Sequence, residues 1–123
     1  MKKTGIILVF ALLCSVIAHA QLKVIARGNA VTIDTSGFPP TMRAAYSLMA
    51  QKCSRCHTLE RIIVAVQSGV CPLSKTRFTK KTSESIVVRM YLKPESNITK
   101  KEAKTILDLL HYLLDENTTV AEK

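Results

Sequence analysis

The spacing of hydrophobic residues predicts a chain that is mostly helical. From Thr41 onward, apolar residues recur at intervals of three and four, at Met42, Ala45, Tyr46, Met49 and Cys53. This spacing places them on one face of a helix, and Pro39 and Pro40 stand where proline is favoured, at the start of a helix. We therefore expect a helix from about Thr41 to Cys53.

Two segments in the middle of the chain predict further helices. The run LERIIVAVQSGV (59–70) is continuously apolar, so its pattern fits either a helix or a buried strand, and we favour the helix. A polar, basic loop is expected at CPLSKTRFTKK (71–81). The segment SESIVVRMYL (83–92) then predicts a helix that ends at Lys93, because Pro94 disfavours helical geometry in the residue before it.

The last predicted helix has the clearest signals. Thr99 and Glu102 match the T-x-x-E capping box, in which each side chain accepts a hydrogen bond from the backbone N–H of the other residue. An apolar stripe follows at Ala103, Ile106, Leu107, Leu110, Leu113 and Leu114. The opposite face is polar, with Lys100, Lys104, Asp108, His111 and Asp115. These elements predict an all-α domain over residues 41–123.

Residues 21–40 precede this domain and show only weak alternation of apolar and polar residues. The segment ends in Gly37, Pro39 and Pro40, which are typical of turns. We therefore expect an extended N-terminal leader with little regular structure.

Residues 1–20 have the features of a signal peptide for export. Lys2 and Lys3 precede an apolar run (5–18) that is shorter than the ~20 residues needed to cross a bilayer. Ala18 and Ala20 are small residues that suit cleavage after Ala20. A retained membrane anchor is the less favoured alternative. Cleavage takes two of the 18 Lys and Arg residues and leaves 16 basic and 9 acidic residues, a net charge of +7, on a chain long enough for one compact domain.

The predicted mature chain keeps Cys53, Cys56 and Cys71, an odd number for a disulfide framework in an oxidising compartment. The first two belong to the motif CSRCH, which ends in His57. A structural zinc site needs four ligands, and the only further candidates are Cys71 and His111. A thioredoxin-type dithiol needs a strand that leads into the motif at the start of a helix, and it leaves His57 without a role.

A covalently attached haem uses every ligand of this motif. Two thiols at this spacing can form thioethers with the two vinyl groups of a haem, and the histidine directly after them can bind the iron. We therefore expect one haem c, attached through Cys53 and Cys56, with His57 as the proximal iron ligand. Cys71 is left without a partner in the chain.

The motif and the order of the predicted elements resemble the c-type cytochromes, in the small class I form. In that family a helix leads into C-x-x-C-H, a second axial ligand comes from the later half of the chain, and a C-terminal helix crosses the first. This order covers residues 41–115, and RMYLKPESNI (89–98) is similar to a pattern of small bacterial cytochromes. The resemblance implies a class I cytochrome c-like helical domain around one haem, and the signal peptide predicts that it is exported to the periplasm.

The distal iron ligand has four candidates. Met42 and Met49 lie on the helix that enters the motif, where the short tether to His57 would hold them on the wrong side of the iron, so we expect them in the core. His111 lies on the solvated face of the last helix. Met90 lies on an apolar helical face in the region from which the family takes its second ligand, and we expect it to be the distal ligand.

These features predict a one-electron carrier in a periplasmic electron-transfer chain, and not an enzyme. The alternative is a haem-based gas-sensing or ligand-binding module with an open or labile sixth position. The excess of positive charge predicts redox partners with an acidic docking surface. Export from the cytoplasm argues against a nucleic-acid partner, and we expect no membrane span after signal cleavage. The basic residues that we expect to contribute are Lys93, Lys100, Lys101, Lys104, Lys75, Arg77, Lys80 and Lys81.

Overall fold

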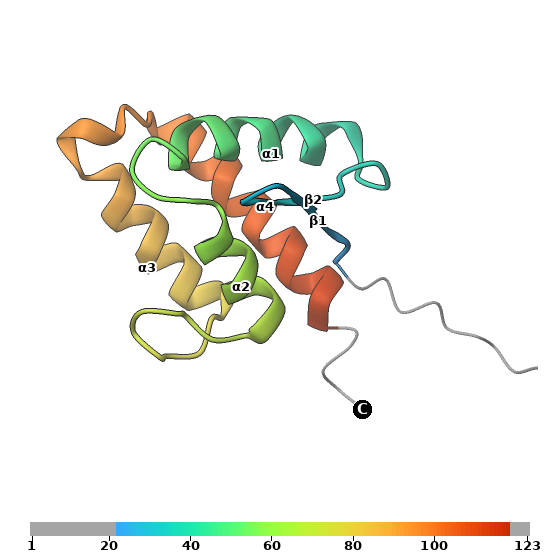
Figure 1. Ribbon diagram of the computed structural model, residues 1–123. Coiled ribbons are helices and arrows are strands. Elements are labelled where there is room, and N and C mark those ends of the chain that lie inside the picture. Colours follow the sequence, from blue (N-terminus) through green and yellow to red (C-terminus); the bar gives the residue numbers. More distant parts are fainter. Residues whose placement is uncertain (1–21, 119–123) are drawn as a thin grey trace, which may run out of the picture.

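The computed structural model describes residues 22–118, so the predicted signal peptide lies outside the described residues. The elements are two strands, β1 (Val24–Arg27) and β2 (Ala30–Ile33), four helices, α1 (Pro40–Cys53), α2 (Glu60–Ser68), α3 (Lys80–Tyr91) and α4 (Lys100–Thr118), and a short 3-10 helix, η1 (Pro94–Ser96) (Figure 1). No helix between residues 22 and 118 is both long enough and apolar enough to cross a membrane.

Most helices begin and end near the predicted positions, but α3 begins at Lys80, inside the segment 71–81 that was expected to be a loop. Thr79 caps this helix, because its hydroxyl accepts a hydrogen bond from the Thr82 N–H at 3.2 Å. α1 starts at Pro40, and the ambiguous run after the motif is confirmed as a helix, α2. Gly69 ends α2 with a φ of 68°, a left-handed conformation that glycine adopts without steric cost. The predicted capping box is present: the Thr99 N–H donates to Glu102 Oε2 at 2.8 Å, and the Glu102 N–H donates to Thr99 Oγ1 at 3.2 Å.

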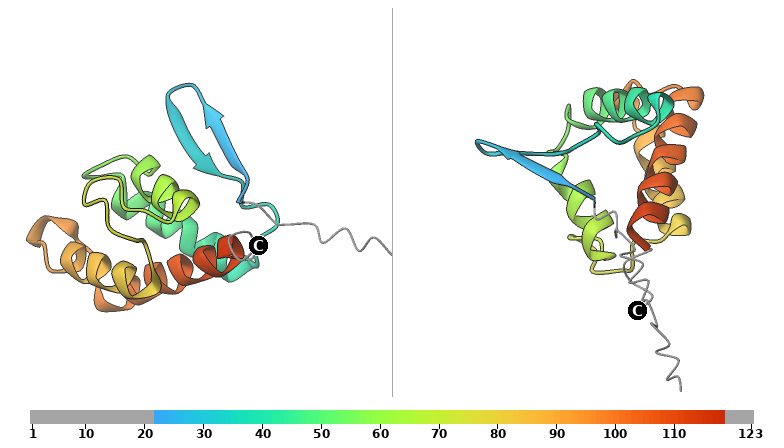
Figure 2. Two further views of the ribbon diagram at one scale, coloured as in Figure 1. Left: turned by 90° about the horizontal axis from the view of Figure 1, so that it is seen from below. Right: turned by 90° about the vertical axis from the view of Figure 1, so that its right-hand side faces the viewer.

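Helix α4 is the centre of the packing and contacts α1, α2 and α3. It crosses α1 at one end of the molecule, while α3 runs alongside it (Figures 1 and 2). The buried side of α4 consists of Ile106, Leu109, Leu110, Leu113 and Leu114. Leu109 was absent from the predicted stripe, yet it is fully buried. Three neighbouring helices surround α4, so its buried face is wider than a single stripe.

The prediction of an all-α fold is wrong, because the supposed unstructured leader forms an antiparallel β-hairpin. In this hairpin Val24 pairs with Ile33 and Arg27 pairs with Ala30. Gly28 begins the two-residue turn with a φ of 60°, the positive value that a tight hairpin turn requires at this position. The domain is therefore a small mixed α/β domain with four helices and a two-stranded sheet within residues 22–118.

Contacts with the helices explain why weak alternation was sufficient for strand formation. Ile33 is 4% exposed, and its backbone N–H donates to the hydroxyl of Tyr46 on α1 at 3.0 Å. β2 also contacts α2. The hairpin projects away from the helices (Figure 2). An isolated two-stranded hairpin is marginally stable in water, so these tertiary contacts stabilise it.

Candidate functional site

The CSRCH motif lies where helix α1 ends. Cys53 is the last residue of α1, and its carbonyl accepts hydrogen bonds from the N–H groups of Cys56 at 3.3 Å and His57 at 3.4 Å. These two hydrogen bonds close a tight turn at the C-terminus of the helix. The turn therefore holds the two thiols and the imidazole close together, at the end of a helix that is anchored on α4.

A cavity of about 380 Å³ opens beside this turn, a size that suits a small-molecule ligand. Its walls are mainly apolar and come from α2, α3, α4 and the loop between α2 and α3, with Ile62, Ala65, Phe78, Ile86, Ile106 and Leu110 among the lining residues. A neighbouring hollow of about 320 Å³ adds Lys52 and Cys56. Cys53, His57, Met90, Lys93 and Ile98 line both spaces.

The imidazole ring of His57 is oriented by a hydrogen bond to the backbone carbonyl of the next residue, Thr58. Its Nδ1 lies 3.0 Å from the carbonyl oxygen of Thr58, which can only accept, so Nδ1 carries the proton in this contact. The Nε2 atom of a neutral ring then keeps its lone pair. A metal-binding histidine commonly has this arrangement, in which one nitrogen donates to a carbonyl and the other is left for the metal.

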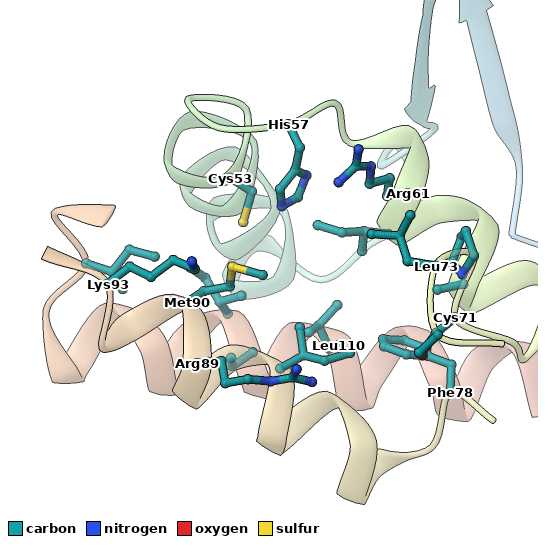
Figure 3. A pocket seen from close by; sticks show the side chains of 18 residues that line it. Cys53, His57, Arg61, Cys71, Leu73, Phe78, Arg89, Met90, Lys93 and Leu110 are labelled. Atoms are coloured by element: carbon teal, nitrogen blue, oxygen red, sulfur yellow. The ribbon is translucent and has the colours of Figure 1, made fainter. Parts of the chain in front are cut away.

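Met90 is the predicted distal residue, and it lines the cavity from α3. Figure 3 shows its side chain pointing from α3 into the space that Cys53 and His57 enter from the opposite wall. Of the other candidates, Met49 is fully buried in the core, and Met42 is partly buried and packs against the core. Neither methionine lines the cavity. The structure thus brings His57 and Met90 together and leaves the other two methionines apart from the site.

His111 also lies away from the cavity. Its Nε2 atom is buried between α4 and α3, at 3.8 Å from Glu84 Oε1, and has no hydrogen-bond partner among residues 22–118. Its neighbour Leu110 does line the cavity. The predicted solvated face of α4 is therefore partly covered by α3 at His111, but this helix directs its apolar residues, and not His111, into the cavity.

The environment of Cys53 differs from that of a redox-active dithiol. Burial, with a smaller effect from Cys56, raises the pKa of the Cys53 thiol to about 11. Reactive cysteines have lowered pKa values and are favoured at helix N-termini, whereas Cys53 is at the C-terminus of α1, where the helix dipole opposes a thiolate. The structure therefore gives no support to the thioredoxin-type alternative.

Two arginines at the rim of the cavity were missed by sequence reasoning. Arg61 from α2 and Arg89 from α3 line the mainly apolar space, and Figure 3 shows them on different walls. Neither forms an ion pair with any carboxylate of residues 22–118. In the sequence, only their nearness to the proposed ligands could have indicated a role at the site: Arg61 is four residues after His57, and Arg89 directly precedes Met90. Two cations over an apolar cavity suit a ligand with an apolar body and acidic groups at one edge.

Cys71 is buried and lines the cavity, close to Phe78 in Figure 3 and away from Cys53. It is a free thiol at the start of the loop between α2 and α3, and its N–H donates to the Thr76 carbonyl at 2.8 Å. Of the two roles left open by the sequence, the structure favours that of a small buried apolar residue.

Within the described part of the chain, no three histidine, cysteine or acidic side chains are grouped so that they could hold a metal ion directly. The zinc alternative, which requires four such ligands, thus gains no support. Comparison with models of known protein families, with curated proteins and with solved structures finds no match for this chain. The residues of the cavity and the C-x-x-C-H motif are therefore the features of this chain that point to a function.

Proposed function

We propose that this protein is a monohaem c-type cytochrome that carries single electrons. One observation is the main support: His57 of the C-x-x-C-H turn and Met90 of α3 line the same apolar cavity. These residue types are an established axial pair for haem iron in proteins of this class. The two thiols beside His57 supply the means of covalent attachment.

The residues that line the cavity fit a haem in their chemistry. Cys53 and Cys56 would hold it by thioethers. Each thiol would add its S–H across the double bond of one vinyl group: one vinyl carbon forms the C–S bond, the other takes the hydrogen atom, and no atom is lost. His57 Nε2 and the Met90 sulfur would bind the iron. Arg61 and Arg89 would pair with the two propionate groups, which need cations at the edge of an apolar cavity.

When bound, a haem supplies one-electron chemistry through ferrous and ferric iron. The task of the chain is then to exclude water and to set the relative stability of the two oxidation states. Apolar side chains such as Ile86, Ile106 and Leu110 surround the cavity and disfavour the extra charge of the ferric state. A methionine ligand acts in the same direction, so both features favour a relatively high potential.

We propose the periplasm as the location and an acidic redox protein as the partner. The support is the predicted signal peptide and the predicted net charge of +7 after its removal. Not all basic side chains are equivalent, because Lys80 pairs with Asp115 and Lys104 pairs with Asp108. Lys93 at the cavity and the exposed Lys75, Arg77 and Lys81 are the better candidates for guiding a partner toward the haem edge.

The first test is the mass of the protein after expression in cells that mature c-type cytochromes. Because thioether formation loses no atoms, the denatured protein should have the mass of residues 21–123 plus one haem. Cys71→Ala should still show the mass of its own polypeptide plus one haem, while the double variant Cys53→Ala, Cys56→Ala should lose the covalent haem. A wild-type protein with the mass of the polypeptide alone would contradict the proposal.

A second measurement separates the carrier from a gas-binding module. The carrier predicts slow or negligible binding of carbon monoxide to the reduced protein, because both axial positions are occupied. Rapid and complete binding by the wild-type protein would instead favour the alternative with an open or labile sixth position.

A further inference from the structure

Lys52 lies directly before the C-x-x-C-H motif and connects it to a distant part of the chain. Its ammonium group donates to the backbone carbonyl of Asn97 at 2.6 Å and lies 3.2 Å from Glu102 Oε1. The side chains of Lys52 and Glu102 are only 14% and 26% exposed. These contacts join the last turn of α1 to the start of α4 and to the segment before it.

The segment that Lys52 contacts forms one side of the cavity. Residues 93–99, here called the distal loop, connect α3 to α4, and its members Lys93 and Ile98 line both hollows beside Met90. At its α3 end the loop is held by backbone hydrogen bonds, from the Lys93 N–H to the Met90 carbonyl at 3.2 Å and from the Ser96 N–H to the Lys93 carbonyl at 3.0 Å.

The other end of the distal loop depends on side chains. Asn97 has a left-handed backbone conformation with a φ of 48°, which is uncommon for a residue other than glycine. Its carbonyl accepts from Lys52, while the next turn is fixed by the capping contacts of Thr99 and Glu102. Glu102 thus accepts from the Thr99 N–H through Oε2 and contacts Lys52 through Oε1.

The chain contains a useful contrast to this arrangement. Lys104 and Asp108 also form an ion pair, at 2.8 Å, but both lie on the exposed surface of α4 and are separated by one helical turn. Ion pairs of this kind on the protein surface contribute little to the free energy of folding. The Lys52 and Glu102 side chains are less exposed than those of Lys104 and Asp108, and their contacts join segments far apart in the sequence. Loss of these contacts would therefore free the distal loop and would not simply remove a surface charge.

We propose that Lys52 is a positioning residue that, together with Glu102, holds the distal loop over the iron site and limits the access of external ligands on the Met90 side. This inference rests on the proposed function. The loop has a closed state and a less populated open state, and an external ligand binds only the open state. The apparent affinity of the protein for the external ligand is then proportional to the fraction of molecules in which the loop is open.

The test uses the haem-loaded protein with cyanide and imidazole as probes of the oxidised iron. We expect Lys52→Gln to bind both probes about tenfold more tightly than wild type, since loss of a charge-assisted contact changes such an equilibrium by roughly this factor. Glu102→Gln should shift affinity in the same direction, because a glutamine can still accept from the Thr99 N–H but loses the ion pair. Lys52→Arg, which keeps donors and charge, and Lys104→Gln, the matched control, should stay within about twofold of wild type.

Hydrogen exchange gives a readout that does not depend on the iron. The amides of residues 93–99 should exchange faster in Lys52→Gln than in wild type or Lys104→Gln, while the amides of α4 beyond its first turn stay protected. This pattern separates a freed loop from general unfolding.

Failure of this inference is distinguishable from failure of the proposed function. If the wild-type mass shows no haem, the proposed function fails. If haem is attached and Lys52→Gln binds the probes no more tightly than wild type, or if Lys104→Gln shows an equal increase, the role of Lys52 is refuted while the haem assignment stands.

Discussion

His57 and Met90 line one cavity, although His57 follows the end of α1 and Met90 lies near the end of α3. They enter the cavity from opposite walls (Figure 3). The contacts of α1 and α3 with the same helix, α4, produce this relationship. Packing around α4 therefore determines whether the two side chains can bind one iron.

Replacement of Met90 tests the distal ligand. In Met90→Ala the absorption band that arises from methionine bound to ferric iron should disappear, and the reduced protein should bind carbon monoxide readily, because the sixth position is open. Met49→Leu is the matched control, since Met49 is buried in the core and away from the cavity, and leucine keeps its volume approximately. Survival of the band in Met90→Ala would show that another residue is the ligand.

The two rim arginines should raise the reduction potential. Each positive charge near the proposed haem would disfavour the ferric state, so Arg61→Gln and Arg89→Gln should each lower the potential, by roughly 20–60 mV for a charge about 10 Å from the iron. Redox titration measures the shift. Lys104→Gln removes the same charge from a position outside the cavity and should have a smaller effect. Equal shifts in all three variants would mean that the arginines have no special place at the haem.

Electron transfer to an acidic partner should depend strongly on salt. At ~0.1 M ionic strength the screening length is about 10 Å, so the bimolecular rate should fall steeply as salt rises through this range. Stopped-flow measurements with an acidic redox protein would show this. Lys81→Gln should weaken the dependence more than Lys80→Gln, because Lys80 is already paired with Asp115. A rate that is constant or rises with salt would indicate docking through apolar contacts.

The capping carboxylate of α4 predicts a dependence of stability on pH. The Thr99 backbone N–H, with a smaller effect from Lys52, holds the pKa of the Glu102 carboxyl below its ordinary value of 4.5. A lowered pKa in the folded state means that the stabilisation is complete above about pH 4.5 and is lost as the pH falls through the folded-state pKa.

The measurement is the melting temperature of wild type and Glu102→Gln as a function of pH. The advantage of wild type should be full at neutral pH and should shrink as the pH is lowered below 4.5. Glu95→Gln is the control: it removes a carboxylate that makes no hydrogen bond or ion pair with residues 22–118. A difference between wild type and Glu102→Gln that stays constant down to pH 3 would contradict the role of the ionised carboxylate.

Local signals in the sequence were enough to place most of the helices and the C-x-x-C-H turn, although the start of α3 at Lys80 was missed. The capping box of Thr99 and Glu102 and the proline at the start of α1 act within one helical turn, so they operate whatever the rest of the chain does. The C-x-x-C-H motif is equally local, because its geometry follows from a single turn at the end of α1. The haem itself stays a prediction from this motif.

Only the tertiary structure decided the features that depend on distant contacts. The β-hairpin was missed because its short strands are stabilised by contacts such as that between Ile33 and Tyr46, which no local pattern encodes. The closeness of His57 to Met90 and the contact of Lys52 with Asn97 likewise arise when α4 brings α1 and α3 together. Hydrogen bonds and charges act over a few ångströms in space, and spacing along the chain determines such distances only within one element.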